Sequence, residues 1–90
     1  MTFEWDPQKN EENLRKHGIT LIDAMEVFED DYRIEELDDR DYGEERWTVI
    51  GQISAGFVFV VYTLRNAVIR LISARKAKID EQKRYFTGWD

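Results

Sequence analysis

The sequence predicts an α+β fold in which N-terminal helices precede a three- to four-stranded antiparallel sheet, followed by a C-terminal helix. Three observations predict it. Helix boundary signals fall before residue 30, three segments rich in β-branched and aromatic residues lie between residues 46 and 74, and helical spacing returns after residue 75. Because 90 residues allow one hydrophobic core, we expect a single domain over residues 1–90.

The first helix has clear boundary signals. Asp6 is placed to cap its N-terminus, Pro7 suits the first helical position, and Gly18 is a typical stop just beyond the end. These signals predict a helix from Pro7 to about His17. Its residues are almost all polar, so the helix can bury little apolar surface by itself.

Two aromatic residues before this helix supply an anchor. We expect Phe3 and Trp5 to insert into the core or to pair along a sheet edge.

A second, amphipathic helix is predicted from Ile19 to Phe28, with Thr20 at its start and Asp23 three residues later as a weak capping box.

The segment from residue 29 to residue 45 is crowded with acidic residues. Tyr32, Ile34 and Leu37 indicate a short edge strand before a turn at Asp41-Tyr42-Gly43. The acids do not follow a calcium-loop pattern, so they are interpreted as a solvated edge rather than a metal site.

The three following strands are predicted at residues 46–53, 57–64 and 67–74, and their short connections favour an antiparallel meander. The middle strand is apolar on both faces, which requires cover from helices or from a partner chain. On the last strand, Arg75 is expected to share a face with Ile69 and Leu71 if the pleat continues that far.

Helical spacing from Lys76 to Phe86 predicts a basic terminal helix, with Gly88 as its terminator. Trp89 either packs back on the domain or contacts a partner.

The chain has no cysteine and one histidine, which excludes disulfides and thiolate or histidine-rich metal sites, so no metal or cofactor is expected. Without a signal-like start or a long apolar run, the expected location is cytoplasmic, with no membrane partner.

Charge is distributed unevenly along the chain. The net charge is −6, yet residues 1–45 hold sixteen acidic and five basic residues, whereas residues 46–90 hold eight basic and three acidic ones. Opposite fields on two parts of one domain favour a phosphate chain at one surface and a basic partner at the other, although ordinary solvated charge is an equal alternative.

A few side chains are suited to cleavage of a phosphodiester, which needs proton transfer and cations that stabilise the phosphorane. His17 is the only histidine, and Arg65, Arg70 and Arg75 supply cations with a planar fork. A structural role remains an alternative for each of these four residues. His17 fits a helix C-terminus, Arg65 a turn, Arg70 a strand surface and Arg75 a salt bridge.

Two stretches together resemble the BrnT toxin family. The first is FEWDPQKN at residues 3–10, continued by NLRKHGI at 13–19, and the second is ISARKA at 72–77. Between them YGEERW at 42–47, IG at 50–51 and VYT at 61–63 occur in the expected order, so the resemblance covers nearly the whole chain.

The resemblance implies a RelE-like fold and a ribonuclease toxin of a type II toxin-antitoxin system that inhibits translation. It also implies neutralisation by a BrnA-type antitoxin encoded beside the toxin, in a heterotetramer with two copies of each chain. In that family the antitoxin carries the DNA-binding portion, so the pair would repress its own promoter, with operator DNA contacted through the antitoxin.

By position, the resemblance assigns His17 to proton transfer and Arg65 and Arg75 to phosphate and transition-state stabilisation, in a metal-independent endoribonuclease. The cations assigned to positioning the RNA are Lys9, Lys16, Arg70 and Lys76.

Two other functions remain open. Leu64 stands where a polar or acidic residue often precedes the arginine in the family, which together with the negative net charge suits a catalytically degenerate RelE-fold binding protein that acts through its antitoxin or as a regulator. A nucleic-acid-binding regulator without enzymatic activity has less support, because such proteins usually carry a basic balance.

Overall fold

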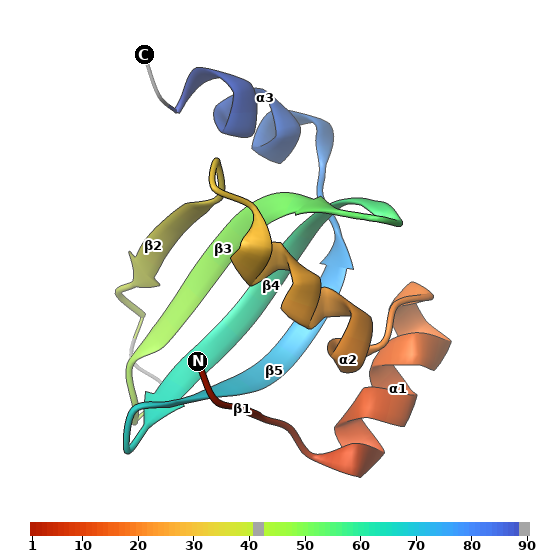
Figure 1. Cartoon of the computed structure of the whole chain (residues 1–90), viewed down its shortest axis with the longest axis vertical. Helices are drawn as coiled ribbons and strands as arrows, with labels where there is room; N and C mark the ends of the chain where they lie inside the picture. Colours follow the sequence, from red (N-terminus) through yellow and green to blue (C-terminus); the bar gives the residue numbers. More distant parts are fainter. Residues whose placement is uncertain (41–42, 89–90) are drawn as a thin grey trace.

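The α+β class is confirmed by a computed structural model, which describes residues 1–40 and 43–88. Its elements are β1 (Phe3–Glu4), α1 (Pro7–His17), α2 (Leu21–Ala24), the 3₁₀ helix η1 (Met25–Glu29), β2 (Ile34–Asp38), β3 (Arg46–Ile53), β4 (Gly56–Arg65), β5 (Val68–Lys76) and α3 (Ile79–Thr87). The strands form one mixed sheet in the order β1-β5-β4-β3-β2 (Figure 1). The four antiparallel strands were expected, and β1 adds a fifth strand parallel to β5.

The boundaries of α1 are those that the sequence predicts. The Asp6 carboxylate accepts a hydrogen bond from the Gln8 N–H at 2.9 Å, and Gly18 adopts the left-handed conformation with φ 72°. Ahead of α1, Phe3 pairs with Ile69 along the edge of β5 and also packs against the core. Edge pairing and insertion into the core, which were expected as alternatives, therefore occur together.

The prediction of one regular α-helix from 19 to 28 is wrong. Only Leu21–Ala24 is α-helical, and Met25–Glu29 is a 3₁₀ helix. Leu21, Ala24 and Val27 are each completely buried, and they are spaced three residues apart. Beyond Ala24 the chain turns with the 3₁₀ period of three residues, which places Val27 on the sheet in line with Ala24.

β3 has the predicted bounds, β4 extends one residue further at each end, and β5 starts one residue later and ends two residues later than predicted. The edge strand suggested by Ile34 and Leu37 is present as β2, whereas the Asp41-Tyr42 part of the predicted turn and Trp89 lie outside the described residues. Arg65 is the last residue of β4, and β5 continues to Lys76, so the arginines that were expected in a turn or beyond a strand end belong to strands.

A register shift in β5 changes which face Arg75 occupies. Val61 pairs with Ser73, but the next residue, Tyr62, pairs with Leu71. The pleat therefore does not continue as assumed, and Arg75 pairs with Phe59 on the face opposite to that of Leu71.

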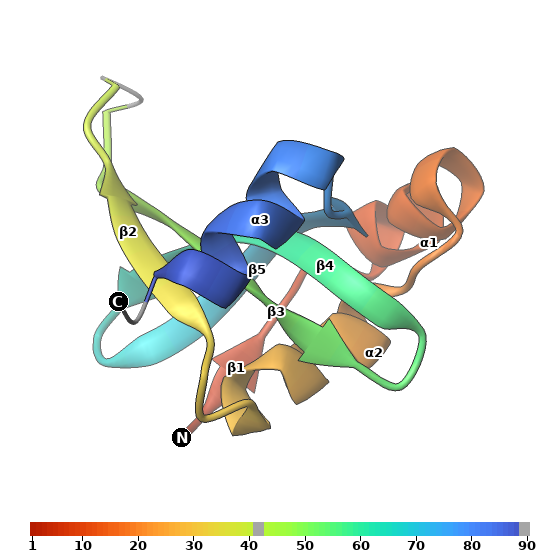
Figure 2. The same cartoon turned by 90° about the horizontal axis from the view of Figure 1, so that it is seen from above.

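Helices cover both faces of the sheet, as the apolar middle strand requires. One face packs against α2 and η1 in the main core, and Figure 2 shows α3 on the opposite side. There the Phe57 ring contacts Tyr85 and Phe86 of α3, with centroid distances of 5.1 and 5.5 Å. Within the described residues, no helix is long and apolar enough to cross a bilayer.

Candidate functional site

A small cavity near the ends of β4 and α1 brings charged residues together from distant parts of the sequence. Its volume is about 150 Å³, and we call it the arginine cavity. It is lined by Asp6, Lys9, Glu44, Arg46, Arg65, Arg70, Leu71 and Ile72. Four cations and two carboxylates therefore surround one hollow.

The hairpin between β4 and β5 positions two of these arginines. Asn66 and Ala67 both have positive φ, 52° and 65°, as a two-residue turn of type I′ requires. This tight turn pairs Arg65 with Val68, and Arg70 pairs with Thr63. Because β4 alternates, Arg65 and Arg70 fall on the same face of the sheet.

Carboxylates accompany both arginines. Arg65 Nη2 lies 3.2 Å from Glu44 Oε1, and Arg70 Nη1 lies 3.4 Å from Glu4 Oε1 across the β1–β5 pair. The Arg65 side chain is 51% exposed and that of Glu44 is 32% exposed, so both groups reach solvent and remain accessible to a ligand. An exposed ion pair of this kind contributes little to stability.

A second cavity of about 190 Å³ adjoins the first and shares Lys9 and Ile72 with it. We call it the histidine cavity; its other lining residues are Glu12, Asn13, Lys16, His17 and Ser73. The α1 residues occur at spacings of three and four, which places them on one side of that helix beside β5. The two cavities thus form one charged surface between α1 and the sheet.

Arg75 and Lys76 lie outside both cavities. Arg75 forms two 2.8 Å hydrogen bonds to the carboxylate of Glu81 in α3, and its guanidinium lies 4.2 Å from the Phe59 ring centroid. The hydrogen bond from Arg75 lowers the pKa of Glu81 below its ordinary value. Lys76, at the end of β5, is exposed.

The structure therefore brings together five of the seven residues predicted for the site, namely Lys9, Lys16, His17, Arg65 and Arg70. It also adds Asp6, Glu44 and Arg46, to which the sequence assigned no chemistry. A signal existed for Arg46. It begins a strand that must pair with β4, so it was bound to lie near the β4 end that carries Arg65.

The chemistry available here is that of ionised side chains. Arginines and a lysine around a hollow suit a phosphate group, and a nearby carboxylate can accept a proton. Among the described residues, no three histidine or carboxylate side chains cluster so as to hold a metal ion.

A helix-flanked sheet with cations and carboxylates around one hollow defines a small domain suited to bind a polyanion and to transfer protons beside it. Residues 5–81 match the family model described as "Ribonuclease toxin, BrnT, of type II toxin-antitoxin system". The chain belongs to this family, which confirms the resemblance seen in the sequence. No curated protein matches the chain.

Proposed function

We propose that this chain is a metal-independent endoribonuclease that cleaves RNA in the cytoplasm and thereby inhibits translation. The observation that carries the proposal is the convergence of Lys9, Arg46, Arg65 and Arg70 with Glu44 on one cavity, in a chain that belongs to a ribonuclease toxin family. The cations would hold the scissile phosphate and stabilise the charge that develops on its oxygens.

The reaction needs a proton acceptor and a proton donor on opposite sides of the phosphate. The 2′-oxygen attacks phosphorus as its proton passes to a base, and the bond from phosphorus to the 5′-oxygen breaks as that oxygen receives a proton. The products are a 2′,3′-cyclic phosphate and a 5′-hydroxyl. Water and metal ions take no part in this balance.

We assign the proton acceptor to Glu44 and the proton donor to His17. Lys9 lines both cavities, so a phosphate held by Lys9 has Glu44 in the cavity on one side and His17 in the cavity on the other. The other acid, Asp6, already accepts the hydrogen bond that caps α1. Histidine is suited to proton donation near neutral pH.

Glu44 also answers the difficulty raised by Leu64. Where the family pattern often places an acid directly before the arginine, this chain has a leucine that is 52% exposed. The carboxylate that contacts Arg65 comes instead from Glu44, twenty-one residues earlier in the sequence. A proton acceptor is therefore present beside Arg65 without an acid at position 64.

For Arg75 we propose a positioning role in place of direct contact with RNA. Its guanidinium joins β5 to α3 through Glu81, and Glu81 also accepts a hydrogen bond from the Lys78 N–H at the start of α3. Lys16, which is exposed and lines the histidine cavity, remains proposed as a contact to the RNA backbone, whereas Lys76 lies outside both cavities and would act only through its charge.

A type II family implies an antitoxin partner. We propose a BrnA-type protein encoded beside this chain, which forms a heterotetramer with two copies of each and represses the operon through its own DNA-binding portion.

The test is cleavage of an RNA oligonucleotide by the purified chain, with the products examined for 2′,3′-cyclic phosphate ends. Arg65→Ala and Glu44→Gln should each reduce the cleavage rate by roughly 100-fold, the usual scale for a lost electrostatic or acid–base group. Arg15→Ala is the matched control, because Arg15 is exposed on α1 and lines neither cavity. Equal rates for all three variants would contradict the proposal.

A second candidate function is binding without catalysis. The net charge of −6 favours it, since negative charge weakens an RNA site, and Leu64 favours it if Glu44 does not replace the acid at that position. The same assay separates the two functions, because a binding protein would capture its antitoxin yet leave RNA intact and leave translation in a cell-free extract unaffected.

A further inference from the structure

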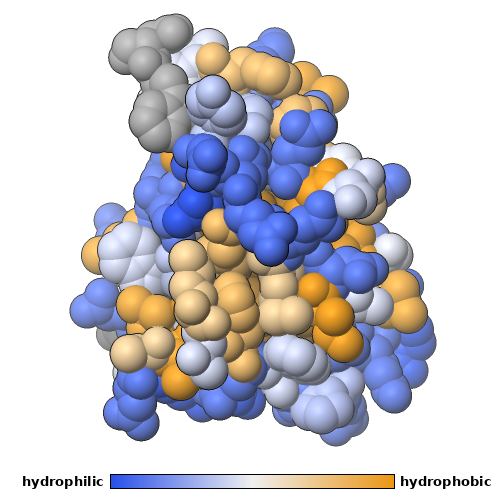
Figure 3. Space-filling view, in the orientation of Figure 1, coloured by the Kyte–Doolittle hydropathy of each residue, from blue (hydrophilic) through white to orange (hydrophobic). Residues whose placement is uncertain are grey.

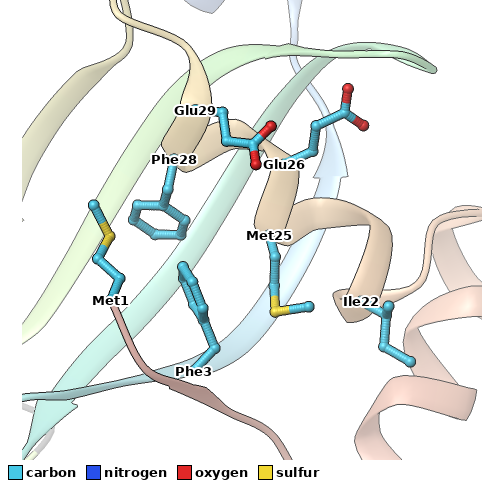
Figure 4. Close-up of a pocket in the computed structure, with 7 residues that line it drawn as sticks. All are labelled: Met1, Phe3, Ile22, Met25, Glu26, Phe28 and Glu29. Carbon is cyan, nitrogen blue, oxygen red and sulfur yellow. The ribbon is translucent and has the colours of Figure 1, made fainter.

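An open apolar hollow lies between β1 and the α2–η1 segment, on the face of the sheet that these helices cover. It has a volume of about 510 Å³ and is lined by Met1, Phe3, Ile22, Met25, Glu26, Phe28 and Glu29. Figure 4 shows the Met1, Phe3, Met25 and Phe28 side chains converging, with the two glutamates at one rim. In Figure 3, apolar residues gather over this part of the molecule beside a strongly hydrophilic area.

An acidic hollow of about 420 Å³ adjoins the apolar one and shares Glu26 and Glu29 with it. Asp30 contributes a third carboxylate. Glu26 accepts hydrogen bonds from Ser54, and Asp30 accepts them from Gln52 and Tyr85. Among the described residues that line the two hollows, none is a lysine or an arginine. Arg33, outside the lining, acts on the charge of Asp30, so the lining itself is net acidic.

Charge decides what this double hollow, here called the η1 groove, can bind. RNA is repelled by the carboxylates, which leaves a partner that carries both apolar and basic side chains. The apolar hollow offers space for large aliphatic or aromatic side chains of a partner. Ile22, in its lining, is 46% exposed. An amphipathic helix with apolar residues at spacings of three and four and a lysine or arginine one turn further along meets both requirements.

We propose that the η1 groove is the docking site for a basic amphipathic segment of the antitoxin, an inference that rests on the proposed function. Of residues 1–40 and 43–88, none lines both this groove and either the arginine or the histidine cavity. Groove substitutions therefore separate binding of the antitoxin from cleavage of RNA.

The test uses growth arrest on induced expression, with and without the protein encoded by the neighbouring gene, together with co-purification of the two chains. The variants are Ile22→Glu, which places a charge in the apolar hollow, and Glu29→Lys, which reverses a rim charge. Leu37→Glu is the matched control, because Leu37 is 48% exposed on β2 and lines neither hollow. All positions are exposed, so folding should be retained.

We expect every variant to arrest growth as the native chain does. The neighbouring gene should rescue cells that express the native chain or Leu37→Glu, and it should fail with Ile22→Glu and Glu29→Lys, whose co-purification should fall by roughly tenfold or more. Unchanged rescue and co-purification of both groove variants would overturn the inference. So would a native homodimer that Ile22→Glu dissociates while rescue persists, because the occupant would then be a second copy.

Failure of the proposed function has a different signature. In that case the native chain itself would neither arrest growth nor cleave RNA, whatever the groove variants do. A native chain that is inactive yet loses its partner on Ile22→Glu substitution would still support the groove, since co-purification does not depend on toxicity.

Discussion

The side-chain amide of Asn13 makes with Ala74 the two hydrogen bonds that a neighbouring strand would make. Asn13 Nδ2 donates to the Ala74 carbonyl at 2.7 Å, and the Ala74 N–H donates to Asn13 Oδ1 at 3.1 Å. The same Nδ2 donates to the Ile19 carbonyl at 2.8 Å. One buried side chain thus continues the edge of β5 beyond β1 and fixes α1, the helix that carries Lys9 and His17.

Replacing Asn13 with alanine should destabilise the fold by about 3 kcal/mol, because it leaves buried backbone groups of Ala74 and Ile19 without partners. Urea unfolding monitored by circular dichroism gives the value. Asn10→Ala is the control. The Asn10 side chain is only part-buried, and its Oδ1 accepts a hydrogen bond from the Leu21 N–H, so this substitution should cost about 1 kcal/mol. Equal effects at the two positions would contradict this account of Asn13.

Gly51 should not tolerate a side chain. A Cβ atom at this position would lie 2.6 Å from Val27 Cγ2, within the packed core. We expect Gly51→Ala to reduce the free energy of unfolding by about 1–3 kcal/mol through overpacking. The Gly51→Ala, Val27→Ala double variant provides the check, because making room on η1 should recover part of the loss if the contact is the cause.

The ion pair between Arg75 and Glu81 should make stability depend on pH in the acid range. The hydrogen bond from Arg75 lowers the pKa of folded Glu81 below 4.5, so the pair stabilises the fold above that pH and the contribution disappears as the pH falls through the lowered pKa. The difference in unfolding free energy between the native chain and Glu81→Gln should therefore be largest near pH 7 and shrink below about pH 4.

Denaturant unfolding at several pH values measures this difference. The pH dependence should become smaller when Arg75→Gln is introduced into both chains, because Glu81 then loses its arginine partner and keeps the hydrogen bond from the Lys78 N–H. A difference that stays constant from pH 7 to about pH 3 would show that the pair does not anchor α3 in this way.

The elements that the sequence predicts well are those determined by neighbouring residues. The ends of α1 follow from Asp6, Pro7 and Gly18, each of which acts on backbone groups within one turn. The strands follow from runs of β-branched and aromatic residues for the same reason. The η1 helix was missed because its period is chosen by packing against the sheet, which brings Val27 over Gly51.

The candidate site was predictable in part. Lys9, Lys16 and His17 share a side of α1, so their proximity follows from helical spacing. The contact of Glu44 with Arg65 depends on how the segment before β3 meets the end of β4, and no local pattern encodes that. The salt bridge that the sequence left open for Arg75 is present, but the face of Arg75 was predicted wrongly, since the bulge in β5 sets that face and the partner Glu81 lies in α3.

Substitutions of Lys9 and Lys76 distinguish RNA binding at the proposed site from attraction by overall positive charge. Lys9 lines both cavities, whereas Lys76 is also a lysine, is exposed, and lines neither cavity. If RNA lies along the charged surface, Lys9→Ala should lower kcat/KM for an RNA oligonucleotide by roughly tenfold or more and reduce the slope of log affinity against log salt by about one, because one phosphate contact is lost. Lys76→Ala should change the rate by less than about twofold, since a peripheral charge acts only through the screened field.

Cleavage rates and binding measured over a series of salt concentrations provide both quantities for each variant. Equal losses for the two variants would mean that RNA responds to overall charge, and the assignment of cleavage to the two cavities would then be wrong.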